Sequence, residues 1–252
     1  ILKTIMKEAR KGNSKPRLQQ VRLERQACLV NALGLPGEGV EKFSETIIDN
    51  PLWNHKKPIG LSIGGEDLDD YIKTFNVLDT MSNKLKSSKY FFELNISCPN
   101  TENGKTICQE PLNLEILLKN IRSLSSKVIS VKVSPDVSDE TLLIIGEICN
   151  SLPHILINAG NTKYMKPSQV GVDKYNFSMK GGGLSGTALF NRTIEMVNLF
   201  ANFKVPIMAT GGISTIEHVK AAKYAGATLF GMATSLVLDP YCIPRINLQL
   251  KC

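Results

Sequence analysis

The chain has 252 residues, 42% of them hydrophobic, and a formal net charge of +7. This length and apolar content predict a single globular domain over residues 1–252, long enough for an α/β barrel or a doubly wound sheet. The positive charge does not indicate a nucleic-acid partner, because the basic residues are spread out, with local density only over residues 3–25, and no basic motif is interleaved with aromatic residues.

Apolar runs and helically spaced apolar residues alternate along the chain, which predicts strands and helices in turn. In chain order, the predicted elements are a strand over Ile59–Ile63, a helix over Leu68–Lys84, a strand over Phe91–Asn95, a helix near Leu112–Ile121, a strand over Val128–Val133, a helix over Thr141–Leu152, a strand over Ile155–Ile157, a helix near Ala188–Ala201, a strand over Ile207–Thr210, a helix over Thr215–Ala225 and a strand over Leu229–Met232. Ser138 or Asp139 is the expected cap of the Thr141–Leu152 helix. This repetition implies parallel strands joined by right-handed crossovers.

These elements include six clear strands, and Ile1–Lys3 fits the end of a seventh. We therefore expect a (β/α)8 TIM barrel whose first strand would precede Ile1, so that the domain is incomplete at its N-terminus. An open, doubly wound sheet is the alternative, and the glycine-rich segments described below favour the barrel. Residues 162–180 are predicted to form a long insertion without regular structure at a strand's carboxyl end, which is typical of an active-site loop.

The six cysteines form no CxxC pair and no cluster with histidine at ligand spacing. This pattern argues against a metal site and against a disulfide framework, and it predicts a reducing, cytoplasmic compartment. No apolar stretch approaches the roughly 20 residues that a membrane helix needs. No signal-peptide pattern opens the sequence.

The most informative motif is Asn95-Ile96-Ser97-Cys98-Pro99-Asn100, which follows the apolar run Tyr90–Leu94. Its polar side chains stand where a strand ends and a loop begins, which is where barrel enzymes carry their catalytic groups. Pro99 stiffens the turn, and the carboxamides of Asn95 and Asn100 can each donate and accept hydrogen bonds to a planar, amide-rich ligand. The motif predicts proton transfer by Cys98. The alternative is a buried cysteine at a strand end, with the two asparagines capping a turn.

A second set of polar residues interrupts or ends the predicted strands. Lys132 lies inside the apolar strand Val128–Val133, and an inward-facing lysine is costly unless it meets an anion or an electron-rich ring. A lysine at a sheet edge that reaches water is the alternative. Further carboxamide and hydroxyl groups follow other apolar runs, at Asn31, Asn158, Asn161 and Thr162. Taken singly, each of these asparagines is also typical of a turn.

Three segments in the last third of the chain predict a phosphate site. Gly181–Gly186 precedes a helix, Thr210–Ile213 follows a strand, and Ala233-Thr234 follows the last strand. In a barrel, the loops after the seventh and eighth strands and a short helix N-terminus form such a site, because glycines let backbone N–H groups approach an anion closely. The alternative is that these glycines serve tight turns only.

These motifs together resemble the dihydroorotate dehydrogenase family, with matching order and spacing along nearly the whole chain. The segments that carry the resemblance are Gly12–Arg17, Asn31–Pro36, Asn95–Asn100, Val131–Val133, Gly182–Gly186 and Ala209–Ile213. The resemblance implies an FMN-containing (β/α)8 barrel that oxidises dihydroorotate to orotate in pyrimidine synthesis. It also implies that a base removes a proton from ring carbon 5 while a hydride leaves ring carbon 6 for flavin N5.

The resemblance assigns roles to individual residues. Cys98 matches the catalytic base, and a cysteine there, rather than a serine, is similar to the soluble class 1 enzymes. The residues that match substrate-binding positions are Asn31, Asn95, Asn100, Asn161 and Thr162. Those assigned to cofactor binding are Lys3, Lys132, Asn158, Gly182, Gly183, Gly211, Gly212, Ala233 and Thr234. Ala233 departs from the pattern, because the family usually has glycine there.

Several alternatives stay open at this level. The electron acceptor that the resemblance implies is fumarate, NAD through a partner subunit, or a quinone, and a homodimer is a possible assembly. A related FMN barrel that acts on another dihydropyrimidine fits the same motifs. A barrel that binds a phosphate-containing ligand without redox chemistry is the third interpretation.

Overall fold

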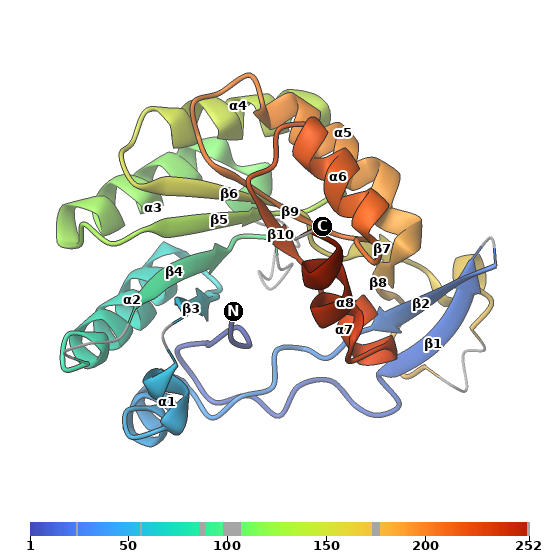
Figure 1. The fold of residues 1–252 in the computed structure, drawn as a ribbon. Helices are drawn as coiled ribbons and strands as arrows, with labels where there is room; N and C mark the ends of the chain where they lie inside the picture. The colour runs from blue at the N-terminus through green and yellow to red at the C-terminus, as the bar shows by residue number, and fades with distance from the viewer. Residues whose placement is uncertain (24, 56, 86–88, 98–106, 173–176, 251–252) are drawn as a thin grey trace. The chain divides into compact units, whose positions relative to one another are not determined.

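The computed structural model describes residues 1–23, 25–55, 57–85, 89–97, 107–172 and 177–250. Figure 1 shows their ribbon, coloured along the chain. These residues group into two compact units, each assembled from several stretches of the chain. Unit 1 comprises Ile1–Gly12, Gly34–Lys132 and Glu147–Leu156, and unit 2 comprises Asn13–Leu33, Val133–Gly146 and Ile157–Cys252. No helix in the described ranges is long and apolar enough to cross a membrane.

Unit 1 is built on three parallel strands, β3 (Ile59–Ile63), β4 (Tyr90–Asn95) and β5 (Ile129–Val133). β4 lies between the other two and pairs with both. All five residues of β3 are buried, as expected for a parallel strand that is covered on both faces. The predicted strands over residues 59–63, 91–95 and 128–133 are therefore confirmed.

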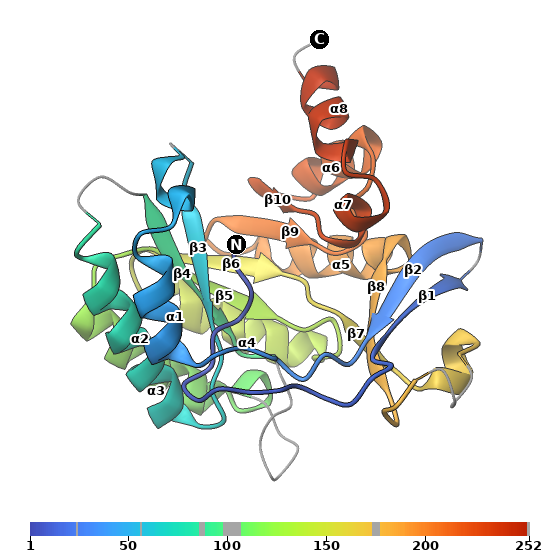
Figure 2. The same ribbon diagram turned by 90° about the horizontal axis from the view of Figure 1, so that it is seen from below.

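Three helices of unit 1 lie next to one another beside these strands (Figure 2). They are α1 (Val40–Ile47), α2 (Leu68–Ser82) and α3 (Pro111–Leu124), with short 3₁₀ helices at Pro51–Asn54 and Ile107–Gln109. α2 begins where the Asp67 carboxylate accepts a hydrogen bond from the Asp70 N–H at 2.8 Å. Phe75 of α2 meets the ring of Phe92 edge to face, with centroids 4.7 Å apart, which fixes the helix against β4.

The first residues of the chain run beside β3. The backbone N–H of Leu2 donates to Gly60 O at 2.8 Å, and that of Ile5 donates to Ser62 O at 2.7 Å. Ile5 also forms a parallel bridge with Ile63. The predicted strand end at residues 1–3 is thus part of a segment that runs beside β3 as far as Ile5 and pairs with it there.

Unit 2 contains a second set of parallel strands. β6 (Ile155–Ala159) begins in unit 1 and ends in unit 2, where it pairs with β9 (Ile207–Thr210), and β9 pairs with β10 (Leu229–Gly231). α4 (Asp139–Asn150) begins in unit 2 and ends in unit 1. Unit 2 also contains the helices α5 (Phe190–Phe200), α6 (Ile216–Tyr224), α7 (Thr234–Leu238) and α8 (Cys242–Gln249). A 3₁₀ turn, Thr187–Leu189, leads into α5.

Unit 2 also contains an antiparallel sheet that the sequence patterns did not predict. Its strands are β1 (Leu18–Leu23), β2 (Gln26–Asn31), β7 (Lys163–Met165) and β8 (Gly182–Gly186), in the order β1-β2-β8-β7. Its buried side chains form a core of their own with Val21, Cys28, Val30, Val170, Phe177, Leu184 and Leu189. The strands lie side by side in both views (Figures 1 and 2).

This sheet corrects two predictions. Residues 162–180 are not without regular structure, because they contain β7 and a 3₁₀ helix, Pro167–Val170. The glycine-rich segment after residue 181 is a strand rather than a loop. Both errors have the same cause: β8 is stabilised by pairing with β2, which is far away in the sequence, and β7 is stabilised by pairing with β8, and local sequence does not record such pairing.

Every strand and helix predicted from the sequence has a counterpart in the described ranges, with ends that differ by a few residues. Ser138 rather than Asp139 caps α4, because its Oγ accepts a hydrogen bond from the Thr141 N–H at 3.3 Å. Thr215 caps α6 in the same way, through the His218 N–H. The single-domain organisation stays a prediction.

Candidate active site

The carboxyl ends of β4 and β5 bring two predicted site residues together in unit 1. Asn95 and Lys132 are register partners, so their side chains leave the sheet on the same face. Asn95 is 6% exposed. The strand end is fixed by two hydrogen bonds to backbone oxygens: Tyr71 Oη donates to Asn95 O at 2.7 Å, and Ser97 Oγ donates to Lys132 O at 2.9 Å. The backbone that carries the Asn95 carboxamide and the Lys132 ammonium group is therefore held by side chains from other parts of unit 1.

Lys3 is also in unit 1, in the extended segment beside β3. Its ammonium group donates a hydrogen bond to Pro36 O at 2.5 Å. The side chain is exposed, so it can reach a ligand without a desolvation cost. Pro36 ends the Asn31–Pro36 motif, and this contact therefore joins a residue assigned to cofactor binding to one of the segments that carry the family resemblance.

Two predicted site residues, Cys98 and Asn100, lie outside the described residues. The described chain reaches Ser97, which directly follows the buried Ile96. The structure therefore describes the first three residues of the Asn95–Asn100 motif. The roles of Cys98 as a base and of Asn100 as a substrate carboxamide stay predictions.

In unit 2, three predicted residues meet around β8. Asn31 is the register partner of Gly183, and its Nδ2 donates to Gly183 O at 3.3 Å. Thr162 packs against the same glycine, in the space that a Cβ on Gly183 would need. Asn161 is next to Thr162 and accepts a hydrogen bond from the Thr162 N–H at 2.9 Å through Oδ1. Two carboxamides and one hydroxyl that belong to distant parts of the sequence are thus held close to one backbone position.

The segments predicted to bind phosphate contact one another within unit 2, through serine and threonine side chains rather than through their glycines. Thr234 Oγ1 donates to Ser185 Oγ at 2.8 Å, and Ser235 Oγ donates to Ile213 O at 2.6 Å. Gly182 and Gly183 lie further back along β8, so it is Ser185, near the end of the strand, that contacts Thr234. A cavity of about 220 Å³ opens there, and its lining includes Gly186, Thr187, Ser214, Thr234 and Ser235.

The Gly211–Gly212 turn has a backbone that only glycine adopts readily. The φ angles are +133° and +74°. A Cβ on Gly212 would lie 2.6 Å from the Phe190 backbone nitrogen, at the start of α5. The turn is therefore pressed against the helix N-terminus. The preceding hydroxyl, Thr210 Oγ1, is buried and has no hydrogen-bond partner within the described part of the chain.

The other two predicted cofactor residues occupy different settings. Asn158 is 2% exposed near the end of β6. Ala233 is the residue before α7. Among the residues that the structure describes, no side chain caps this helix, so its first backbone N–H groups have no capping acceptor there.

His218 is a residue of this region that the sequence patterns missed. Its ring stacks on Phe190 with centroids 4.1 Å apart, and its Nδ1 lies 3.3 Å from the Ser214 N–H nitrogen and 3.2 Å from Ser214 Oγ. Burial lowers the pKa of His218, which favours the neutral ring that can accept the Ser214 N–H. His218 thereby ties α6 to the turn after Gly212. A histidine three residues after a helix cap gives too weak a signal to be found from sequence.

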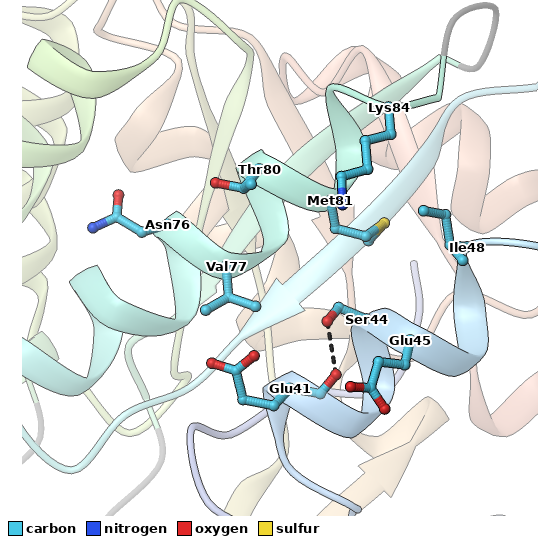
Figure 3. Close-up of a pocket in the computed structure, with 9 residues that line it drawn as sticks. All are labelled: Glu41, Ser44, Glu45, Ile48, Asn76, Val77, Thr80, Met81 and Lys84. Carbon is cyan, nitrogen blue, oxygen red and sulfur yellow. Dashed lines mark hydrogen bonds between the residues drawn. The ribbon is translucent and has the colours of Figure 1, made fainter.

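A larger groove lies elsewhere in unit 1, between α1 and α2 (Figure 3). Its volume is about 610 Å³, and Figure 3 shows that its walls carry the acidic side chains of Glu41 and Glu45 on α1 and the apolar Val77 and Met81 on α2. None of the predicted site residues that the structure describes lines it. Volume alone therefore does not identify the site in this chain.

Comparisons with known proteins identify the family of this chain. The family model described as dihydroorotate dehydrogenase matches residues 1–252. The catalytic subunit of the NAD-dependent dihydroorotate dehydrogenase B of Malacoplasma penetrans is 32% identical over 264 residues, which cover 100% of this chain and 79% of that protein. A quinone-type dihydroorotate dehydrogenase of Crocosphaera subtropica is 28% identical, over 95% of this chain and 65% of that protein.

Solved structures show the fold. The ligand-free dihydroorotate dehydrogenase of Eimeria tenella superposes with a TM-score of 0.77 at 21% identity, covering 98% of this chain and 75% of that one. The same enzyme in complex with ferulenol gives a TM-score of 0.75. The fold is therefore that of a (β/α)8 TIM-barrel enzyme, as predicted, rather than an open doubly wound sheet. Members of the matched family are flavin-dependent oxidoreductases. This chain belongs to the dihydroorotate dehydrogenase family.

Proposed function

We propose that the protein oxidises dihydroorotate to orotate in pyrimidine synthesis, with FMN as its cofactor. The observation that carries the proposal is the register pair Asn95 and Lys132 at the carboxyl ends of two parallel strands, in a chain that the family model matches from end to end. A carboxamide suits the amide-rich ring of dihydroorotate, and an ammonium group suits an electron-accepting flavin ring.

The residues of unit 2 fit the phosphate of FMN. The cavity at the end of β8 is lined by hydroxyl groups and glycine backbone. The Gly211–Gly212 turn has no room for a Cβ at Gly212. The buried Thr210 hydroxyl, without a partner among the described residues, adds a polar group beside this turn. Residues proposed to hold the phosphate are Gly182, Gly183, Gly211, Gly212, Ala233 and Thr234, with Lys3, Lys132 and Asn158 for the ring.

The proposed mechanism assigns proton transfer to Cys98. Its thiolate takes the proton from ring carbon 5 of dihydroorotate, and Asn31, Asn95, Asn100, Asn161 and Thr162 hold the substrate ring. An ordinary cysteine thiol has a pKa near 8.5, so this base works best at alkaline pH unless neighbouring groups assist it. Lys132 adds positive charge beside the flavin ring and raises the affinity of the ring for electrons. When bound, FMN supplies the acceptor for the hydride that leaves ring carbon 6.

The electron acceptor belongs to the same proposal. The names of the relatives include an NAD-dependent catalytic subunit and quinone-dependent enzymes. A cysteine at position 98 supports the soluble class, so we propose that electrons pass to fumarate or, through a partner subunit, to NAD. The scattered cysteines support a cytoplasmic location.

The test starts from the protein purified with its native cofactor. Mass spectrometry of the small molecule released on denaturation should identify FMN. Dihydroorotate should then reduce an artificial electron acceptor with stoichiometric formation of orotate, and dihydrouracil should be a poor substrate because it lacks the carboxylate. Faster turnover of dihydrouracil would favour a different dihydropyrimidine substrate, and the lack of any flavin would favour a barrel without redox chemistry.

A further inference from the structure

Glu93 is a buried carboxyl group that the proposed mechanism does not use. It lies on β4, two residues before Asn95 and on the same face of the sheet, and it is 2% exposed. A buried carboxylate is costly unless hydrogen-bond donors surround it. Two hydroxyl groups on the neighbouring strands meet this need: Ser62 Oγ on β3 lies 3.3 Å from Oε1, and Ser130 Oγ on β5 lies 3.5 Å from Oε2.

The hydroxyl of Ser62 continues toward the candidate site. Ser62 Oγ is 3.1 Å from Thr4 Oγ1, and Thr4 Oγ1 is 3.1 Å from Asn95 Nδ2. The chain of contacts therefore runs from Glu93 through Ser62 and Thr4 to the carboxamide of Asn95. All four residues belong to unit 1.

The series of hydrogen bonds has a direction, because a carboxylate can only accept hydrogen bonds. Ser62 must donate its single hydroxyl proton to Glu93, so toward Thr4 it can only accept. Thr4 in turn donates its single proton to Ser62 and can only accept from Asn95. The group of Asn95 that faces Thr4 must therefore be the amide NH2, and Oδ1 is turned away from Thr4.

We propose that Glu93 is a positioning residue that sets the orientation of the Asn95 carboxamide through Ser62 and Thr4. With the NH2 group held by Thr4, Asn95 presents Oδ1 as an acceptor for a ring N–H of the substrate. This inference rests on the proposed function, in which Asn95 binds dihydroorotate and orotate. A reversed carboxamide would place its oxygen against the oxygen of Thr4 and offer the substrate N–H a second donor.

Two variants interrupt the series of hydrogen bonds at different points. Glu93→Gln keeps the shape of the side chain but adds a hydrogen-bond donor, so the direction of the hydrogen bonds is no longer fixed. Thr4→Val keeps the volume and removes the connecting hydroxyl, and it leaves the buried Glu93 untouched. Thr4→Ser is the matched control, because it keeps the hydroxyl. We expect Glu93→Gln and Thr4→Val each to raise the Kd for orotate about tenfold, which corresponds to about 1.4 kcal/mol, while Thr4→Ser stays close to wild type.

The double variant separates positioning from a general structural effect. If Glu93 acts through Thr4, adding Glu93→Gln to Thr4→Val should have little further effect on the Kd for orotate or on KM for dihydroorotate. Effects that multiply would overturn the proposal, and so would a wild-type Kd in the folded Thr4→Val protein. If Glu93→Gln does not fold, Ser62→Ala, which removes the hydroxyl that joins Glu93 to Thr4, takes its place in the same comparison.

A second readout distinguishes failure of this inference from failure of the proposed function. The side-chain amide protons of Asn95, identified by their loss in Asn95→Asp, can be followed by NMR in the full-length protein without substrate. Their chemical shifts and exchange rates should change in Thr4→Val and stay near wild type in Thr4→Ser. If the wild-type protein does not bind orotate but this pattern holds, the proposed function is wrong and the hydrogen-bond chain stands. Identical amide signals in all three proteins would refute the chain.

Discussion

We expect the proposed phosphate site to be sensitive to a single methyl group at the Gly211–Gly212 turn. Gly212→Ala forces an alanine to adopt a φ of +74°, and its Cβ would lie 2.6 Å from the Phe190 backbone nitrogen and 2.8 Å from the Phe190 Cα. Neither atom is the end of a flexible side chain, so the turn or the start of α5 has to move. We therefore expect a loss of stability together with a loss of flavin affinity.

A matched control elsewhere in unit 2 gives the size of the expected loss of stability. Gly171 has a similar φ of +66°, but a Cβ there would meet nothing within 4 Å. Gly171→Ala should cost only the left-handed strain, about 1–2 kcal/mol. Gly212→Ala carries the same strain and an overpacking cost of about 1–3 kcal/mol. The difference between the two variants isolates the packing of the turn against α5.

Thermal unfolding of the flavin-free proteins measures this difference, at about 2–4 °C for each kcal/mol in a chain of this size. A flavin fluorescence titration then measures cofactor affinity, which we expect to fall at least tenfold in Gly212→Ala and to stay near wild type in Gly171→Ala. Equal melting temperatures and equal affinities in the two variants would show that the turn yields easily, which would refute the reasoning.

Three further predictions concern single side chains. Cys98→Ala should slow flavin reduction by dihydroorotate by about 10²–10⁴-fold while orotate still binds, and Cys98→Ser should keep partial activity with a pH optimum moved upward, as single-turnover measurements against pH will show. Because the pKa of His218 is lowered in the folded state, its contribution to stability should be complete above the ordinary value of 6.5 and should be lost as pH falls below it. Melting temperatures of wild type and His218→Gln should therefore converge in acid, and a constant gap from pH 5 to 8 would contradict this. Arg192 pairs with Asp139 at 2.8 Å and donates to Val137 O at 2.9 Å, so Arg192→Met should lower the unfolding free energy by about 1–3 kcal/mol in urea titrations, and an unchanged midpoint would count against it.

The parallel strands and their helices were predictable because their signals are local. β3 and β9 have the bounds that their apolar runs predicted. The antiparallel strands were not predictable, because β1 carries glutamine and arginine and β8 is mostly glycine. Such segments become strands only by pairing with one another, and β2 and β8 are far apart in the sequence.

Some residues of the candidate site could likewise be predicted from the sequence, and others could not. Lys132 was found because a charge inside an apolar strand is unusual, and Glu93 carries the same signal within the run Tyr90–Leu94. Thr4 and Ser62 could not be found, because a threonine and a serine are unremarkable until folding places them in a chain of hydrogen bonds 58 residues apart in sequence.

The most direct test of the central claim is a single-turnover experiment without oxygen. Flavin-loaded protein is mixed rapidly with dihydroorotate, and flavin absorption and orotate are followed together. We predict that the flavin is fully reduced, with one orotate formed for each flavin, and that the rate is lowered when deuterium replaces hydrogen at ring carbon 6. A flavin that stays oxidised in the presence of saturating dihydroorotate would contradict the proposed function.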